Sequence, residues 1–240
     1  MNSPTRTARL TGAAYLGLAV TGLLGFLVIR PQLQGADDPT TTVANILENG
    51  ALANLGVGLE LLVVITQALA ALGFYALFRN ERPVAAYGVA TFGMANAAAI
   101  LVSAAMLSSA VNVATTPALA PAGDAAGTVA LLYSLSDSLW AAGGVFFGLW
   151  LIPMGWFMIS TKRMPRILGI ILIVGGIGYV LSAVLAATIE TFPTALADVL
   201  VLPATVGELW TVGYLLVRGI RPLHESVPTP TLEPPAVATR

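Results

Sequence analysis

The sequence predicts an all-α, polytopic membrane protein, a helical bundle with six transmembrane helices. Of its 240 residues, 57% are hydrophobic and only 10% are charged, whereas soluble domains carry roughly a quarter charged residues. So few charges could not cover a water-soluble surface, and they fall mainly between six long apolar stretches. The apolar excess is therefore expected to face lipid.

Each of these stretches is long enough to cross roughly 30 Å of hydrocarbon as a helix. We expect the spans at about 10–29, 53–78, 83–111, 128–160, 167–189 and 199–217. The alternative for the first is a secretory signal peptide, but its length and the lack of a small-residue cleavage site favour a retained helix. We expect Arg30-Pro31 to end that helix, and Asp38-Pro39 to begin a short capped helix on the membrane surface.

The basic residues predict the orientation of the six spans. With the N-terminus in the cytoplasm, ten of the eleven basic residues fall on the cytoplasmic side and only Arg30 falls outside, as the positive-inside rule requires. The ten are Arg6, Arg9, Arg79, Arg82, Lys162, Arg163, Arg166, Arg218, Arg221 and Arg240. The chain then divides into a cytoplasmic segment 1–9, a transmembrane domain 10–221 and a proline-rich, disordered cytoplasmic tail 222–240.

Four stretches of the chain resemble a known family. They are Arg9–Tyr15 (RLTGAAY), Ala71–Pro83 (ALGFYALFRNERP), Phe146–Gly169 with its closing RMPRILG turn, and Glu208–Gly219 (ELWTVGYLLVRG). Together they resemble the bacterial domain-of-unknown-function 4386 (DUF4386) family of multi-pass membrane proteins. The resemblance implies this topology, carries no established activity, and marks Glu208 as matching the family's acidic position. With the arginine-rich basic set, it places the protein in a bacterial inner (cell) membrane, with both termini cytoplasmic.

The residue inventory excludes several kinds of chemistry. There is no cysteine, the one histidine (His224) lies in the tail, and the one lysine (Lys162) lies in a basic loop. Thiolate chemistry, iron–sulfur clusters, bis-histidine haem and a serine–histidine–acid triad are therefore ruled out. We expect no enzyme activity, no catalytic residue, no metal site, no cofactor and, because basic residues are sparse, no nucleic-acid partner. An intramembrane enzyme is the last-ranked alternative.

Three acids fall within the predicted spans, at different depths. At 1.5 Å per helical residue, Glu208 is about 15 Å from Arg218, near mid-membrane. Glu60 is about 28 Å from Arg79, and Asp137 is farther still from Lys162, so both are expected near the outer boundary. With no basic residue expected inside any span, Glu208 is expected to be uncharged at rest.

Helical spacing places polar partners beside these acids. Glu60 shares a stripe with Gln67, and Asn96 with Ser103 makes a comparable line on the third span. One interpretation is an outward-facing acid-lined cavity, with Glu208 at its floor and Glu60 and Asp137 at its mouth. The alternatives are that Glu60 and Asp137 simply touch interfacial water, that Gln67 and Asn96 join helices, and that Glu208 donates one buried hydrogen bond.

Two functional hypotheses follow. In the first, a small solute or proton binds in the cavity or crosses through it, with Glu208, Glu60, Asp137, Gln67 and Asn96 as the binding set. In the second, the protein is a non-catalytic membrane interaction or scaffold protein that packs against a second copy or another membrane protein. Under either hypothesis the bilayer is the surrounding partner, and the loop Lys162–Arg166 is assigned to orientation and lipid anchoring.

Overall fold

The structure is a computed structural model that describes residues 4–35 and 38–221, so the predicted tail 222–240 lies outside the described residues. Six helical segments in it are long and apolar enough to cross a membrane, which confirms the all-α, six-span prediction. The spans are Pro4–Leu33, α4 (Gly50–Phe78), α5 (Pro83–Thr115), α6 (Ala125–Thr161), α7 (Arg166–Thr188) and α8 (Thr194–Val217). The short helix α3 (Pro39–Glu48) and the 3-10 turns η2 (Pro117–Leu119) and η3 (Pro121–Gly123) join spans at one end.

The first span does not end at Arg30-Pro31, so that prediction was wrong. The helix α1 (Pro4–Gly22) passes into a π-helical segment η1 (Leu23–Ile29) and then into α2 (Arg30–Leu33). A proline in an α-helix clashes with the carbonyl four residues before it and lacks an N–H to bond it. Here the Arg30 N–H already bonds the carbonyl of Gly25, five residues back, so the widened turn accommodates Pro31. The helix therefore carries Arg30 into the bundle.

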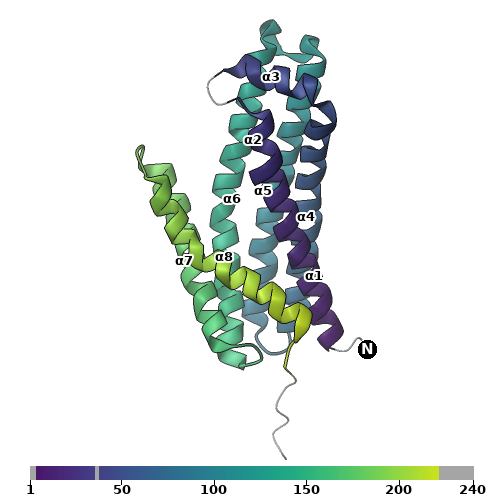
Figure 1. The fold of residues 1–240 in the computed structure, drawn as a ribbon. Coiled ribbons are helices and arrows are strands. Elements are labelled where there is room, and N and C mark those ends of the chain that lie inside the picture. The colour runs from purple at the N-terminus through teal and green to yellow at the C-terminus, as the bar shows by residue number, and fades with distance from the viewer. Residues whose placement is uncertain (1–3, 36–37, 222–240) are drawn as a thin grey trace, which may run out of the picture.

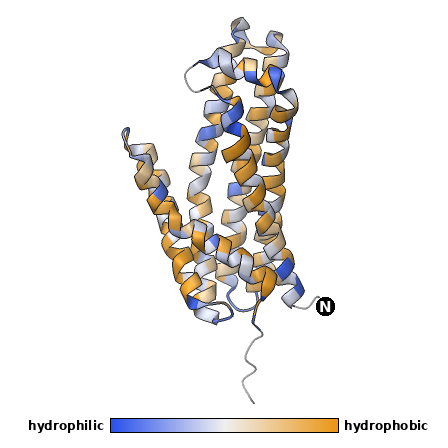
Figure 2. Cartoon of the chain, in the orientation of Figure 1, coloured by the Kyte–Doolittle hydropathy of each residue, from blue (hydrophilic) through white to orange (hydrophobic). Residues whose placement is uncertain are grey.

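The helices pack in chain order, α1 against α4, α4 against α5, α5 against α6, α6 against α7 and α7 against α8, and α8 returns to α1. Figure 1 shows α1, α4, α5 and α6 as an upright body, while α7 and α8 form a hairpin that meets the body at one end and leans away at the other. We call the end with the N-terminus the inner end and the end with α3 the outer end. Figure 2 shows orange apolar residues along the spans. Many large apolar side chains on the spans are exposed, as expected of a surface that faces lipid.

Glycines bring α7 close to both of its neighbours. An added Cβ at Gly176 would meet the carbonyl of Gly148 on α6, and one at Gly178 would overlap the carbonyl of Leu200 on α8. Small residues of this kind let membrane helices approach backbone to backbone. Gly178 therefore lies on a packing surface between α7 and α8.

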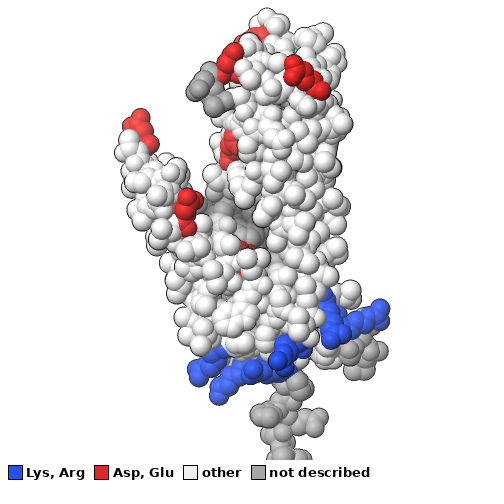
Figure 3. All heavy atoms as spheres, in the orientation of Figure 1, with Lys and Arg blue, Asp and Glu red and all other residues white. Residues whose placement is uncertain are grey.

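Charged residues are sorted between the two ends of the bundle. Figure 3 shows Lys and Arg side chains gathered at the inner end and acidic side chains toward the outer end. Arg30 departs from this pattern because it is only 6% exposed and lies inside the bundle.

One basic residue of the loop after α6, Arg163, makes contacts within the protein and is not free to anchor lipid as predicted. Arg163 is buried, pairs with Glu81 from the loop between α4 and α5, and donates its Nε–H to the carbonyl of Arg221 at 2.7 Å. It therefore ties three inner-end segments together, whereas Lys162 beside it is exposed.

Candidate functional site

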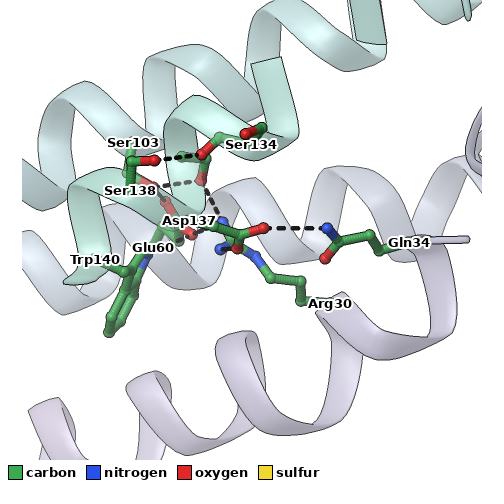
Figure 4. Close-up of polar contacts among 9 residues, drawn as sticks. Arg30, Gln34, Glu60, Ser103, Ser134, Asp137, Ser138 and Trp140 are labelled. Carbon is green, nitrogen blue, oxygen red and sulfur yellow. Dashed lines mark hydrogen bonds and ion pairs between the residues drawn. The ribbon is translucent and has the colours of Figure 1, made fainter. Parts of the chain in front are cut away.

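A cluster of polar side chains surrounds Arg30 in the outer half of the bundle (Figure 4). Its guanidinium contacts Glu60 on α4 at 3.0 Å and Asp137 and Ser136 on α6. The face of Phe26 lies 5.0 Å from the guanidinium carbon. One cation from the first span thus joins two acids from two other helices.

Every carboxylate oxygen of the cluster accepts a hydrogen bond. Glu60 accepts from Arg30 and from the Trp140 indole N–H (3.0 Å) at one oxygen, and from Ser103 (2.8 Å) at the other. Asp137 accepts from Arg30 at one oxygen and from Gln34 (3.1 Å) at the other. Ionised carboxylates are acceptor-only groups, which is the pattern both acids show here. With both acids ionised, the three charged groups would sum to −1.

The structure corrects two sequence-based expectations about this region. Glu60 is 3% exposed, so it lies inside the bundle and not in contact with interfacial water. The prediction that no basic residue enters a span was also wrong, because Arg30 lies beside Glu60. The signal that could have found this pair is the isolated position of Arg30, the one basic residue away from the inner side. Asp137 is the member that reaches the surface, with its side chain 38% exposed.

A small cavity adjoins the cluster on the side of the π-helical segment. Gly25, Arg30, Glu60 and Tyr133 are among its lining residues, and its volume is about 10 Å³. That is at the lower limit of the room one water molecule needs. The cluster therefore has space for a water-sized group and not for a larger solute.

Gln67 and Asn96 form a second polar layer, closer to the middle of the bundle. Both are buried between α4 and α5, and the Asn96 amide donates to the Gln67 carbonyl oxygen over 3.5 Å. The Gln67 amide nitrogen has no hydrogen-bond partner among the described residues. These two residues join helices, which matches the alternative interpretation of them, and their burial keeps them off any open surface.

Glu208 lies apart from both layers, on α8 where that helix crosses α1. It is half-buried and accepts a hydrogen bond from the Tyr15 hydroxyl on α1 at 2.5 Å. The Tyr15 ring packs edge-on against Phe74 and Trp150. None of the three ion pairs within the described part of the chain involves Glu208. The Glu208 carboxyl group therefore has a hydrogen-bond donor that is held among aromatic rings, and it has no ion-pair partner among the described residues.

A hollow separates the α7–α8 hairpin from the body of the bundle. Figure 3 shows acidic side chains at both edges of this hollow and at its floor, with the basic side chains gathered away from it at the inner end. Among the five predicted site residues, Asp137 and Glu208 are the two with exposed surface, and Glu60, Gln67 and Asn96 are buried. The predicted set thus divides between two residues with exposed surface and three in the interior of the bundle.

These features define a class of protein, an integral membrane protein that crosses the bilayer six times and keeps charged and amide side chains between its helices. The chain belongs to the family described as Domain of unknown function (DUF4386), whose model matches residues 10–219. The match confirms the family resemblance seen in the sequence. No curated protein and no solved structure matches the chain.

Proposed function

We propose that this protein binds a small cationic solute or a proton in the hollow between the α7–α8 hairpin and the body, and carries it across the membrane. The observation that supports this proposal is the charge along the hollow. Acidic side chains border it, and Arg30, which lies between the spans, is already shared by two carboxylates.

The outer cluster supplies an attractive field for a cation. Its net charge of −1 lies in surroundings of low dielectric constant, where Coulomb interactions are several times stronger than in water. Asp137 brings that field to the surface of the bundle because more than a third of its side chain is exposed. In this proposal a cation meets Asp137 before it reaches Glu208.

Glu208, on α8 where that helix crosses α1, is the proposed exchange site. A carboxyl group in a membrane interior is costly when ionised and unpaired. An incoming cation would offset that cost, and Tyr15 would hold one carboxyl oxygen in place while the other is engaged. No group of three or more metal-ligating side chains occurs within residues 4–35 and 38–221. Because the proposed exchange needs no covalent step, we propose a carrier or binder and not an enzyme.

The proposed location is the bacterial cell membrane, with both termini in the cytoplasm. The gathering of basic side chains at the inner end supports this orientation under the positive-inside rule. Because the chain has no native cysteine, single cysteines can report sidedness with a membrane-impermeant maleimide. Cysteines at Gln34, Ala122 and Thr194 should react in intact cells, and cysteines at Asn80, Thr161 and Val227 only after permeabilisation. Reaction of the Asn80 position in intact cells would overturn the orientation.

A flux measurement tests the function. Purified protein in proteoliposomes, with a pH-sensitive dye inside, is compared with Glu208→Gln and with the control Glu48→Gln, the same change on the exposed side of α3. We expect Glu208→Gln to abolish proton flux or proton-coupled organic-cation flux, and Glu48→Gln to retain it. Equal flux in all three proteins would sink the carrier proposal.

A second candidate is a non-catalytic interaction protein whose hollow receives a helix of another membrane protein or of a second copy. The observation that favours it is a face of α6 on which Ser134, Ser138 and Ala141 are exposed. Small and hydroxylated residues are typical of helix–helix contacts in membranes. This candidate predicts that Ser138→Leu disrupts assembly measured by in-cell crosslinking, while Glu208→Gln leaves it unchanged.

A further inference from the structure

A groove on the lipid-facing side of the molecule lies between α5 and α6 at the inner end. It encloses about 760 Å³ and is lined mainly by apolar side chains. Gly88 keeps the floor of the groove open, because it leaves only a hydrogen beside the ring of Pro153. Tyr87 and Trp156 line it as well, and they are 62% and 56% exposed. It lies away from the polar clusters described above and shares no lining residue with them.

One cation stands at the inner end of this groove. Arg82 is exposed, and its guanidinium is oriented by two hydrogen bonds, from Nε to the Ser160 hydroxyl and from Nη1 to the carbonyl of Glu81, both 3.1 Å. The first bond ties the end of α6 to the start of α5. The arginine is thus held at the level where the apolar spans end, which is the level of the lipid headgroups.

The length of the groove matches one leaflet of a bilayer. From Arg82 to Phe92, the farthest lining residue along α5, the helix rises about 15 Å. Half of a hydrocarbon core is also about 15 Å. An extended acyl chain with its phosphate at Arg82 would therefore follow the groove to mid-membrane. The exposed rings of Tyr87 and Trp156 are of the aromatic type that favours the membrane interface.

We propose that this groove is a binding site for one anionic phospholipid of the inner leaflet. Arg82 binds the phosphate, and one acyl chain lies over Gly88 and Pro153 between Tyr87 and Trp156. The site is independent of the solute-binding proposal, because none of its residues borders the Arg30 cluster or contacts Glu208.

Lipid retention tests the site. The protein is exchanged into nanodiscs of phosphatidylcholine containing a minor fraction of phosphatidylglycerol, released in the gas phase, and its bound lipids are weighed by native mass spectrometry. We expect one retained phosphatidylglycerol per chain. Arg82→Gln should lower its apparent affinity about fivefold, the effect of losing one basic residue at an anionic headgroup. Thr91→Phe, which fills the groove from an exposed position, should lower it as well.

The matched control is Lys162→Gln, which removes an exposed charge at the same end but outside the groove. Retention unchanged by Lys162→Gln and reduced by the two groove variants supports the site. An equal loss from Arg82→Gln and Lys162→Gln would mean diffuse surface attraction and would overturn it. Equal retention of phosphatidylcholine would also overturn it. Unchanged thermal unfolding of each variant shows that a loss of lipid is not a loss of fold.

Discussion

Replacing Arg30 by methionine should destabilise the protein far more than the loss of a surface charge. Methionine keeps most of the apolar stem of the side chain and removes the guanidinium. Glu60 would then stay buried, with its side chain 4% exposed, and would lose its cation. Removing one partner of a buried ion pair costs about 3–5 kcal/mol, because the remaining charge is uncompensated.

The two acids of the cluster should contribute unequally to this cost. The side chain of Asp137 is 38% exposed, so water can solvate it when Arg30 is absent, and exposed pairs contribute only about 0–1 kcal/mol. The contact of the guanidinium with Phe26 adds about 0.5–2 kcal/mol. Most of the destabilisation should therefore come from Glu60.

Double variants separate these contributions. Equilibrium unfolding in mixed micelles would be followed by circular dichroism for Arg30→Met alone and in combination with Glu60→Gln or Asp137→Asn. Glu60→Gln removes the buried charge and should recover about 1–3 kcal/mol, as neighbouring sites couple in such cycles. Asp137→Asn should recover less. A single-variant cost below about 1 kcal/mol, or equal recovery by both second changes, would refute the assignment of a buried ion pair.

Three further predictions concern packing, the inner-end contacts and pH. Gly178→Leu should disrupt the α7–α8 hairpin, because the added Cβ overlaps the backbone of α8, and it should reduce the yield of folded protein on size exclusion. The control Gly213→Leu should be tolerated, because an added Cβ there meets open space. Arg163→Gln should cost about 1.5–3 kcal/mol through its charged hydrogen bonds, and Lys162→Gln almost nothing; equal melting temperatures would contradict this. Hydrogen bonds from Thr40 in the first turn of α3 lower the pKa of Asp38 below its usual range. The stabilisation from the Asp38 N-cap is therefore fully present above the ordinary aspartate pKa and is lost as pH falls through the lowered pKa. The protection factors of the amides in that turn, which correct for the intrinsic exchange rate at each pH, should therefore fall only in acid. Equal protection of wild type and Asp38→Ala at neutral pH would contradict the capping role.

Periodicity and charge were enough to predict the architecture of this chain. Five of the six spans lie within a few residues of their predicted bounds, because a lipid-facing helix must be apolar over its whole length and its ends carry the charges. The cap at Asp38 was also predictable, since its carboxylate bonds the Thr40 N–H two residues along the chain. Each of these features depends on residues that are close together in the sequence.

The candidate site depended on contacts between distant residues, and there only the tertiary structure decided. Arg30 meets Asp137 across 107 positions and Tyr15 meets Glu208 across 193. A helical periodicity places Glu60 on a face but does not say which helix covers that face. The π-helical segment mattered most, because it carries the first helix past Pro31 and turns an expected loop arginine into the buried partner of two acids. The sequence determined which acidic and amide side chains enter the membrane, and the packing of the helices determined that Arg30 joins two of the acids and leaves Glu208 without an ion pair.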